Sequence, residues 1–110
     1  MVRQSKKVIT SLYYENHLIE ILEYSIETFG YIQAYKYFNT ISQLVEKLYT
    51  DYTYYPECRH LATKSRIYRN IILDAHLILY RITNECIEVL DIIHSASSIG
   101  KIRYTRKIHL

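Results

Sequence analysis

The sequence has few of the residues that interrupt or cross-link a chain, with two glycines, one proline and two cysteines among 110 residues. Cys58 and Cys86 match neither a disulfide framework nor a metal-ligand spacing, so we expect free thiols and no metal. No apolar stretch approaches the ~20 residues of a membrane span. The basic start, Met1 to Thr10, lacks the apolar run of a secretory signal. These absences predict a folded cytoplasmic protein with no membrane role.

The length suits a single domain, residues 1–110, with one modest core. Charge is divided unevenly along it. From Met1 to Cys58 there are 5 Lys/Arg and 7 Asp/Glu, whereas from Arg59 to Leu110 there are 9 and 4. The basic half predicts an acidic partner, either nucleic acid or an acidic protein segment, and charge alone does not choose between them.

The first half of the chain predicts a short strand at residues 7–10 and then a helical hairpin over about residues 12–55. Either Ser11 or Asn16 could cap the first helix, and Gly30 is placed to end it. The second helix is expected to run from about Tyr31 to about Asp51. Its apolar stripe steps by four and three residues: Ala34, Phe38, Ile41, Val45 and Leu48. Two helices joined at one glycine are expected to fold back antiparallel.

The second half predicts an antiparallel meander over about residues 64–94, because two-residue links at Asp74-Ala75 and Asn84-Glu85 permit only tight hairpins. A uniform register sorts the side chains onto two faces, of which the more β-branched one should take the helices. The other face has an apolar centre that nothing in the chain except the tail is left to cover, which predicts a binding surface. If residues 102–108 folded across this face, its apolar centre would be ordinary core. This apolar floor is formed by Ile72, Leu77, Leu79, Leu90 and Ile92.

Beyond the meander lies a basic tail, residues 99–110, in which Ile102, Tyr104, Arg106 and Ile108 alternate with other residues. This alternation predicts a basic edge strand. Lys and Arg on an edge strand discourage aggregation, so the tail's charge has a structural explanation as well as a binding one.

Cations surround the predicted floor. Arg66 lies beside it, with Arg59 and Lys64 nearby in the chain, and these three are the candidates for contacting acidic groups. Arg81 is expected opposite Glu88, where a surface ion pair is the alternative role. His94 ends its strand on the same face. If the protein cleaved RNA, His94 could act as the base and Arg66 and Arg81 as the cations at the phosphate.

Three parts of the chain carry a resemblance to a known family: the run FGYIQAYKYFNTISQLVEKL with YYPECRHL after it, then SRIYRNIILDAHLILYRI, then CIEVLDIIH. Their order resembles the RelE/ParE superfamily of bacterial type II toxins over nearly the whole chain. The resemblance implies an α+β fold, with an N-terminal strand and an antiparallel helical hairpin packed on one face of a small antiparallel sheet. It also implies a cognate antitoxin that wraps the toxin in a hetero-oligomer, and an active groove on the other face.

The family has two activities. RelE-like members cut messenger RNA in the ribosome with groove cations and a nearby Tyr or His, whereas ParE-like members poison DNA gyrase. Leu77 stands where the RelE-like pattern has an arginine, and the segment after His94 lacks the arginine that follows in both patterns. The residues therefore favour a ParE-like toxin that binds a target such as gyrase and needs no cofactor. A ribosome-dependent endoribonuclease is the alternative, and a member that only binds its antitoxin is the third.

Overall fold

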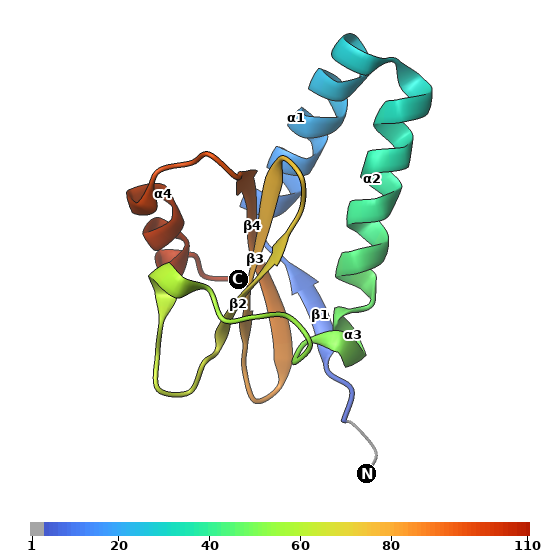
Figure 1. The fold of residues 1–110 in the computed structure, drawn as a ribbon. Coiled ribbons are helices and arrows are strands. Elements are labelled where there is room, and N and C mark those ends of the chain that lie inside the picture. The colour runs from blue at the N-terminus through green and yellow to red at the C-terminus, as the bar shows by residue number, and fades with distance from the viewer. Residues whose placement is uncertain (1–3) are drawn as a thin grey trace.

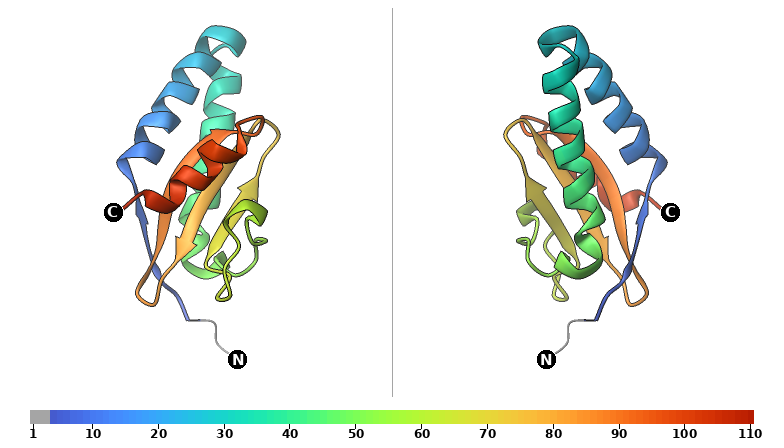
Figure 2. Two further views of the ribbon diagram at one scale, coloured as in Figure 1. Left: turned by 90° about the vertical axis from the view of Figure 1, so that its left-hand side faces the viewer. Right: turned by 90° about the vertical axis from the view of Figure 1, so that its right-hand side faces the viewer.

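The computed structural model describes residues 4–110 as a mixed four-stranded sheet in the order β1-β4-β3-β2 (Figure 1). A helical hairpin covers one face of the sheet, and the C-terminal segment lies across the other (Figure 2). Within these residues no helix combines the length and hydropathy that crossing a membrane requires. The predicted α+β class and helical hairpin are confirmed.

The N-terminal strand leads directly into the first helix. β1 (Lys7–Thr10) pairs parallel to β4. The sheet is therefore mixed, whereas an antiparallel sheet was expected. Of the two candidate caps, Ser11 is the one used, because its Oγ accepts a hydrogen bond from the Tyr14 amide at 3.0 Å. α1 (Leu12–Phe29) therefore begins immediately after the strand.

Gly30 joins the two helices with a φ of 85°, in the region that glycine enters at least cost. α2 (Tyr31–Glu46) runs back along α1, and a short helix, α3 (Leu48–Asp51), continues it. Of the predicted stripe, Ile41, Val45 and, in α3, Leu48 pack in the core on the helix side of the sheet. Ala34 is also buried, and Phe38 is half-buried. The same spacing of four and three residues that suggested the helix thus also supplies its core contacts.

The meander forms as predicted, but its second hairpin contains an irregularity. β2 (Tyr68–Ile72) pairs with β3 (His76–Ile82) in the expected register. Between β3 and β4 (Cys86–His94), Arg81 faces Glu88 as expected, but Leu79 faces Asp91 while Tyr80 faces Val89. Leu90 is therefore the extra residue of a β-bulge.

The bulge reverses the faces of the residues after it. Ile92 packs in the helix-side core and Ile93 in the opposite core, the reverse of the prediction. His94 also moves to the helix side, where it pairs with His76. The bulge is held by the start of α1, because Ser11 donates its amide to the Val89 carbonyl and its hydroxyl to the Leu90 carbonyl.

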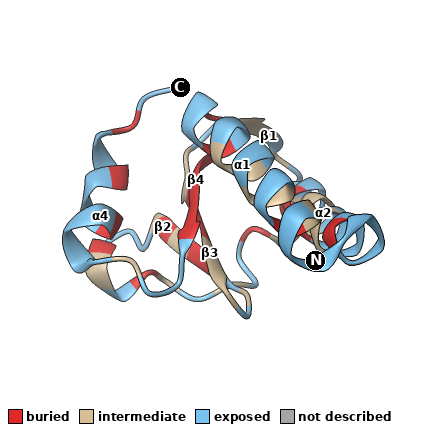
Figure 3. Cartoon of the chain, turned by 90° about the horizontal axis from the view of Figure 1, so that it is seen from above, coloured by how far each residue is buried: buried red, intermediate tan, exposed pale blue. Residues whose placement is uncertain are grey.

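The tail is a helix and not the predicted edge strand. α4 (Ile99–Tyr104) and a 3-10 turn, η2 (Thr105–Lys107), lie beside a second 3-10 turn, η1 (Arg59–Leu61). Figure 3 shows the inward side of this segment as buried and its outer side as exposed. The core beneath it joins the segment to the sheet and to η1: Cys58, Leu61, Tyr68, Leu79, Leu90, Ile93, Ile102 and Ile108.

The apolar floor is consequently not open, and that prediction is wrong. Leu79 and Leu90 are completely buried under the C-terminal segment, Leu77 is half-buried, and Ile92 lies on the other side of the sheet. Ile72 alone among the five is exposed, at the end of the edge strand β2. The sheet therefore has a core on both faces.

Truncation within α4 tests this double core. Ile102 is 6% exposed and Ile99, three residues earlier in the same helix, is 48% exposed. We expect Ile102→Ala to lower the free energy of unfolding by roughly 2–4 kcal/mol, because it leaves a cavity between α4 and the sheet. The matched variant Ile99→Ala should lower it by less than about 1 kcal/mol. Urea denaturation measures both, and equal small losses would show that the tail is not packed.

Candidate functional site

The three residues predicted to act together in RNA cleavage lie apart. Arg81 is in the middle of β3 beneath the C-terminal segment, and Arg66 is exposed on the loop before β2. His94 lies on the helix side of the sheet. No common position for a phosphate group is therefore enclosed by all three side chains.

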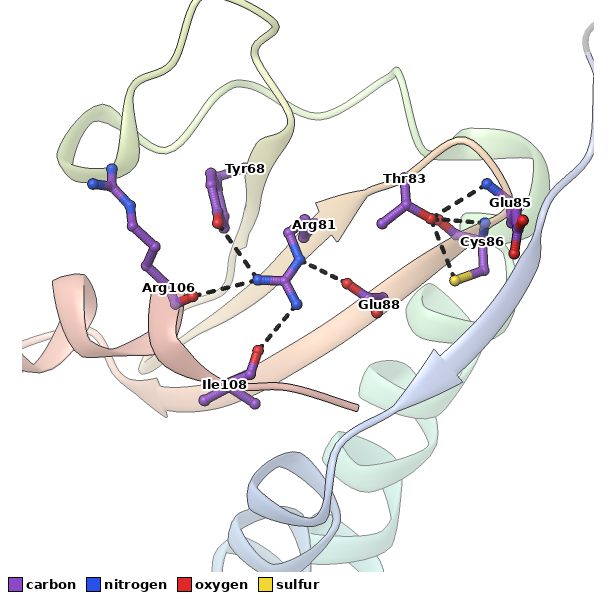
Figure 4. A network of polar contacts seen from close by, with 8 residues as sticks. All are labelled: Tyr68, Arg81, Thr83, Glu85, Cys86, Glu88, Arg106 and Ile108. Carbon is purple, nitrogen blue, oxygen red and sulfur yellow. Dashed lines mark hydrogen bonds and ion pairs between the residues drawn. The ribbon is translucent and has the colours of Figure 1, made fainter.

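Arg81 is occupied by partners within the chain (Figure 4). Its Nε lies 2.6 Å from Glu88 Oε1, and the two side chains are only 13% and 16% exposed. Its other nitrogens donate to the Ile108 carbonyl at 3.0 Å and, at 3.4 Å, to the Arg106 carbonyl and the Tyr68 hydroxyl. The guanidinium thus ties β3 to β4 and to the C-terminal segment.

The protonation of Arg81 is stabilised by these contacts. Burial by itself would lower the pKa of Arg81, but the hydrogen bonds to Tyr68 and Glu88 outweigh it and raise the pKa. Its guanidinium also lies over the Tyr68 ring, 5.7 Å from the centroid, and Arg106 lies over the same ring at 5.6 Å. Arg81 therefore acts as a structural anchor of the tail.

The predicted cations before the meander are free to meet a partner. Arg59, Lys64 and Arg66 are exposed, and the nearest carboxylate oxygen to Arg66 is that of Glu57, at 3.8 Å. Arg66 has a φ of 56°, an uncommon value for a residue with a side chain. It lies in a turn closed by a hydrogen bond that the Arg66 amide donates to the Thr63 carbonyl. The turn leaves its guanidinium directed to solvent.

A cleft of about 930 Å³ lies between the helical hairpin and the adjacent ends of β3 and β4. Most of its lining was not singled out by sequence reasoning, which had named only His94 and, as part of the apolar floor, Ile92. The apolar lining includes Ile21, Tyr24 and Phe29 from α1, and Ile92 from β4. The elements that form it can be followed in Figure 1.

Three histidines line this cleft. His76 Nδ1 lies 2.7 Å from the Tyr37 hydroxyl, and its ring centroid is 5.7 Å from that of His94. On the α1 side, His17 Nδ1 lies 2.6 Å from Asp91 Oδ1. Over residues 4–110, no group of three or more His, Cys, Asp or Glu side chains is placed to hold a metal ion. The cleft therefore offers hydrogen-bonding groups beside aromatic surface.

Burial displaces the pKa of His76 in the cleft and that of Asp91 beside it. Burial lowers the pKa of His76, and the neighbouring His94 lowers it further. Burial raises the pKa of Asp91, although its bonds to His17 and to the Ile92 amide act in the opposite direction. No local pattern in the sequence predicts these contacts, because they join residues distant in the chain and the bulge brings His94 to this side.

The lowered pKa of His76 predicts a pH dependence of stability. The His76 imidazole binds a proton more tightly in the unfolded chain, where its pKa is about 6.5, than in the folded one. The contribution of neutral His76 to the free energy of unfolding is therefore complete above that pH. It is lost as the pH falls below that value towards the lower folded pKa. We expect His76→Gln to flatten the fall in unfolding free energy on acidification, measured by denaturant titration across this pH range. The exposed His109→Gln variant should keep the wild-type profile, and a His76→Gln profile as steep as wild type would contradict the assignment.

Comparison with known proteins identifies the family. A sequence model described as the ParE toxin of the type II toxin–antitoxin system parDE matches residues 8–99. A search of curated proteins finds no significant match. Among solved structures, a chain from the chromosomal ParDE toxin–antitoxin system of P. aeruginosa superposes with a TM-score of 0.68 at 15% identity, over 83% of this chain and 97% of that one. That similarity supports the fold, and the family match shows that this chain belongs to the ParE toxin family of type II toxin–antitoxin systems.

Proposed function

We propose that this chain is a growth-inhibiting toxin of the bacterial cytoplasm that acts by binding a target such as DNA gyrase, not by cutting RNA. The observation that carries the proposal is the closure of the sheet face by α4 and η2. A groove nuclease needs that face to receive its substrate, and here it is filled with core side chains. Family membership supports gyrase as the first target to test.

The arrangement of titratable groups supports the same conclusion. RNA cleavage needs a base at the 2′-hydroxyl and cations at the developing phosphate charge. The one predicted groove cation on the sheet, Arg81, has its charge balanced by Glu88 and its donors taken by carbonyls. His94 is separated from it by the sheet. Neither the base nor the cation is therefore placed to serve a common substrate.

Purified protein allows a direct comparison of the two activities. We expect the toxin to inhibit DNA supercoiling by gyrase and to leave messenger RNA on programmed ribosomes intact, because Arg81 is held by partners within the chain and His94 lies on the other side of the sheet. His94→Ala should leave both results unchanged. Codon-specific messenger cleavage that His94→Ala abolishes would contradict the binding mechanism and establish the endoribonuclease alternative.

Neutralisation by the antitoxin is part of the proposal. We infer that a segment of the cognate antitoxin occupies the cleft between the helical hairpin and the sheet, since this is a large concave surface that stays open when the other sheet face is closed. Exposed aromatic and aliphatic side chains continue from the cleft around the tip of the hairpin: Tyr24, Phe29, Tyr31, Ile32 and Tyr35. Tyr31 and Tyr35 stack with their ring centroids 6.3 Å apart, and large exposed apolar surface of this kind is typical of a protein interaction site.

A matched pair of aromatic truncations tests this interface. Phe29 lines the cleft and is 64% exposed, whereas Tyr54 is 77% exposed and lies beyond the other end of α2. We expect Phe29→Ser to weaken antitoxin binding at least ~10-fold, about 1.4 kcal/mol, because aromatic anchors dominate such interfaces. Tyr54→Ser should change it less than about twofold. Calorimetry with the product of the neighbouring gene measures both, and equal effects would place the antitoxin elsewhere.

A further inference from the structure

Basic residues are concentrated on one side of the molecule. Residues 56–70 and 95–110 together hold 8 of the 14 Lys/Arg but only 1 of the 11 Asp/Glu, so the remainder of the chain has 6 and 10. These two segments are therefore at +7 and the remainder at −4. α1 alone contains four glutamates and no Lys or Arg. The mild net charge of +3 conceals a strongly polarised molecule.

The fold brings the two basic segments together. η1 packs against α4, and the apolar side chains of both, Leu61, Ile102 and Ile108, point inward to one core. The segments lie side by side in Figures 1 and 2. Their cations are left on the outside, and six exposed ones form what we call the basic surface: Arg59, Lys64, Arg66, Arg103, Arg106 and Lys107.

The basic surface is not neutralised from within the chain. Among the described residues, Glu57 is the one carboxylate within 4 Å of any of these six cations, at 3.8 Å from the exposed Arg66. Two of the cations are held in place by rings, Arg106 over Tyr68 at 5.6 Å and Lys107 over Tyr104 at 5.9 Å. Arg81 fixes the backbone of Arg106 from below. Part of the surface is thus positioned before any partner arrives.

The chemistry of this surface favours phosphates over an acidic protein. Protein interfaces depend on buried apolar or aromatic anchors at their centre. Here four large apolar side chains are turned into the core, Leu61, Tyr68, Ile102 and Ile108, and three are left exposed, Ile99, Tyr104 and Leu110. A row of cations with few such anchors suits a regular polyanion recognised by charge alone. We propose that the basic surface binds the phosphodiester backbone of double-stranded nucleic acid without sequence preference. This inference does not depend on the identity of the toxin's target.

Fluorescence anisotropy with the full chain and a short labelled DNA duplex of mixed sequence tests the proposal. Binding should be independent of sequence, and its affinity should fall roughly 10²-fold between about 50 and 200 mM salt if four phosphates are contacted. A matched RNA duplex distinguishes DNA from double-stranded nucleic acid in general, and binding of either supports the surface. Absence of binding at about 100 μM in low salt, or tighter binding of poly-glutamate than of either duplex, would overturn it.

Charge-reversal variants locate the binding surface. Arg103→Glu with Lys107→Glu should weaken duplex binding at least ~10-fold and make the salt dependence shallower. The control Lys36→Glu with Lys47→Glu changes the net charge equally, but at exposed positions on and just after α2. Beyond the loss of affinity that the lower net charge itself causes, it should change duplex binding less than about twofold. Equal losses would contradict a defined surface. Melting curves check folding, and Lys64→Glu with Arg59→Glu tests the other segment if the tail variant is unstable.

Discussion

The ion pair between Arg81 and Glu88 is the interaction on which the exposed surfaces of this toxin depend. It joins adjacent strands at 2.6 Å, and the same guanidinium holds the carbonyls of Arg106 and Ile108. Removing one member of a mostly buried pair leaves a charge without compensation, which is far more costly than losing a surface bridge. Because this anchor fixes the tail, it also fixes which face of the sheet is closed.

Because that face is closed, partners can bind only at other surfaces of the molecule. The helix-side core and the tail-side core bury most of the apolar side chains of the sheet, so partners meet the molecule at its edges. One edge is the cleft with aromatic surface beside His17, His76 and His94. The other is the basic surface of η1 and α4. The two differ in chemistry, since the first is apolar and hydrogen-bonding and the second is rich in cations.

Local signals in the sequence predicted the elements well. The glycine between the helices, the stripe on α2 and the two-residue links each act within a few residues, and each formed as expected. The pairing of Arg81 with Glu88 also followed from the second link, because that part of the hairpin precedes the bulge. The contacts of Arg81 with the tail were not predictable in this way, since Arg106 and Ile108 are more than 20 residues away in the chain.

Two features escaped prediction for different reasons. The bulge at Leu90 has no local signal, because the run from Leu90 to Ile93 suits either face and the choice is made by the contacts of Ser11 with β4. The tail does contain a signal for a helix, but the alternation of residues 102–108 favoured a strand more strongly. Ser98 caps α4 through a bond from the Lys101 amide, and Ile102, Thr105 and Ile108 are spaced by three residues, which places them on one face of tight helical turns. Because of these two errors, the sheet face that the tail covers was predicted to be open.

A double-mutant cycle on Arg81→Gln and Glu88→Gln tests the central claim most directly. The free energy of unfolding of the four proteins gives the coupling between the two side chains. If the pair is the anchor described here, the coupling should exceed ~1 kcal/mol, since a charge-assisted hydrogen bond of this kind is typically worth about 1.5–3 kcal/mol. The Arg81→Gln variant should also lose protection of the C-terminal amides in hydrogen exchange. A coupling near zero with the tail fully protected would contradict the account.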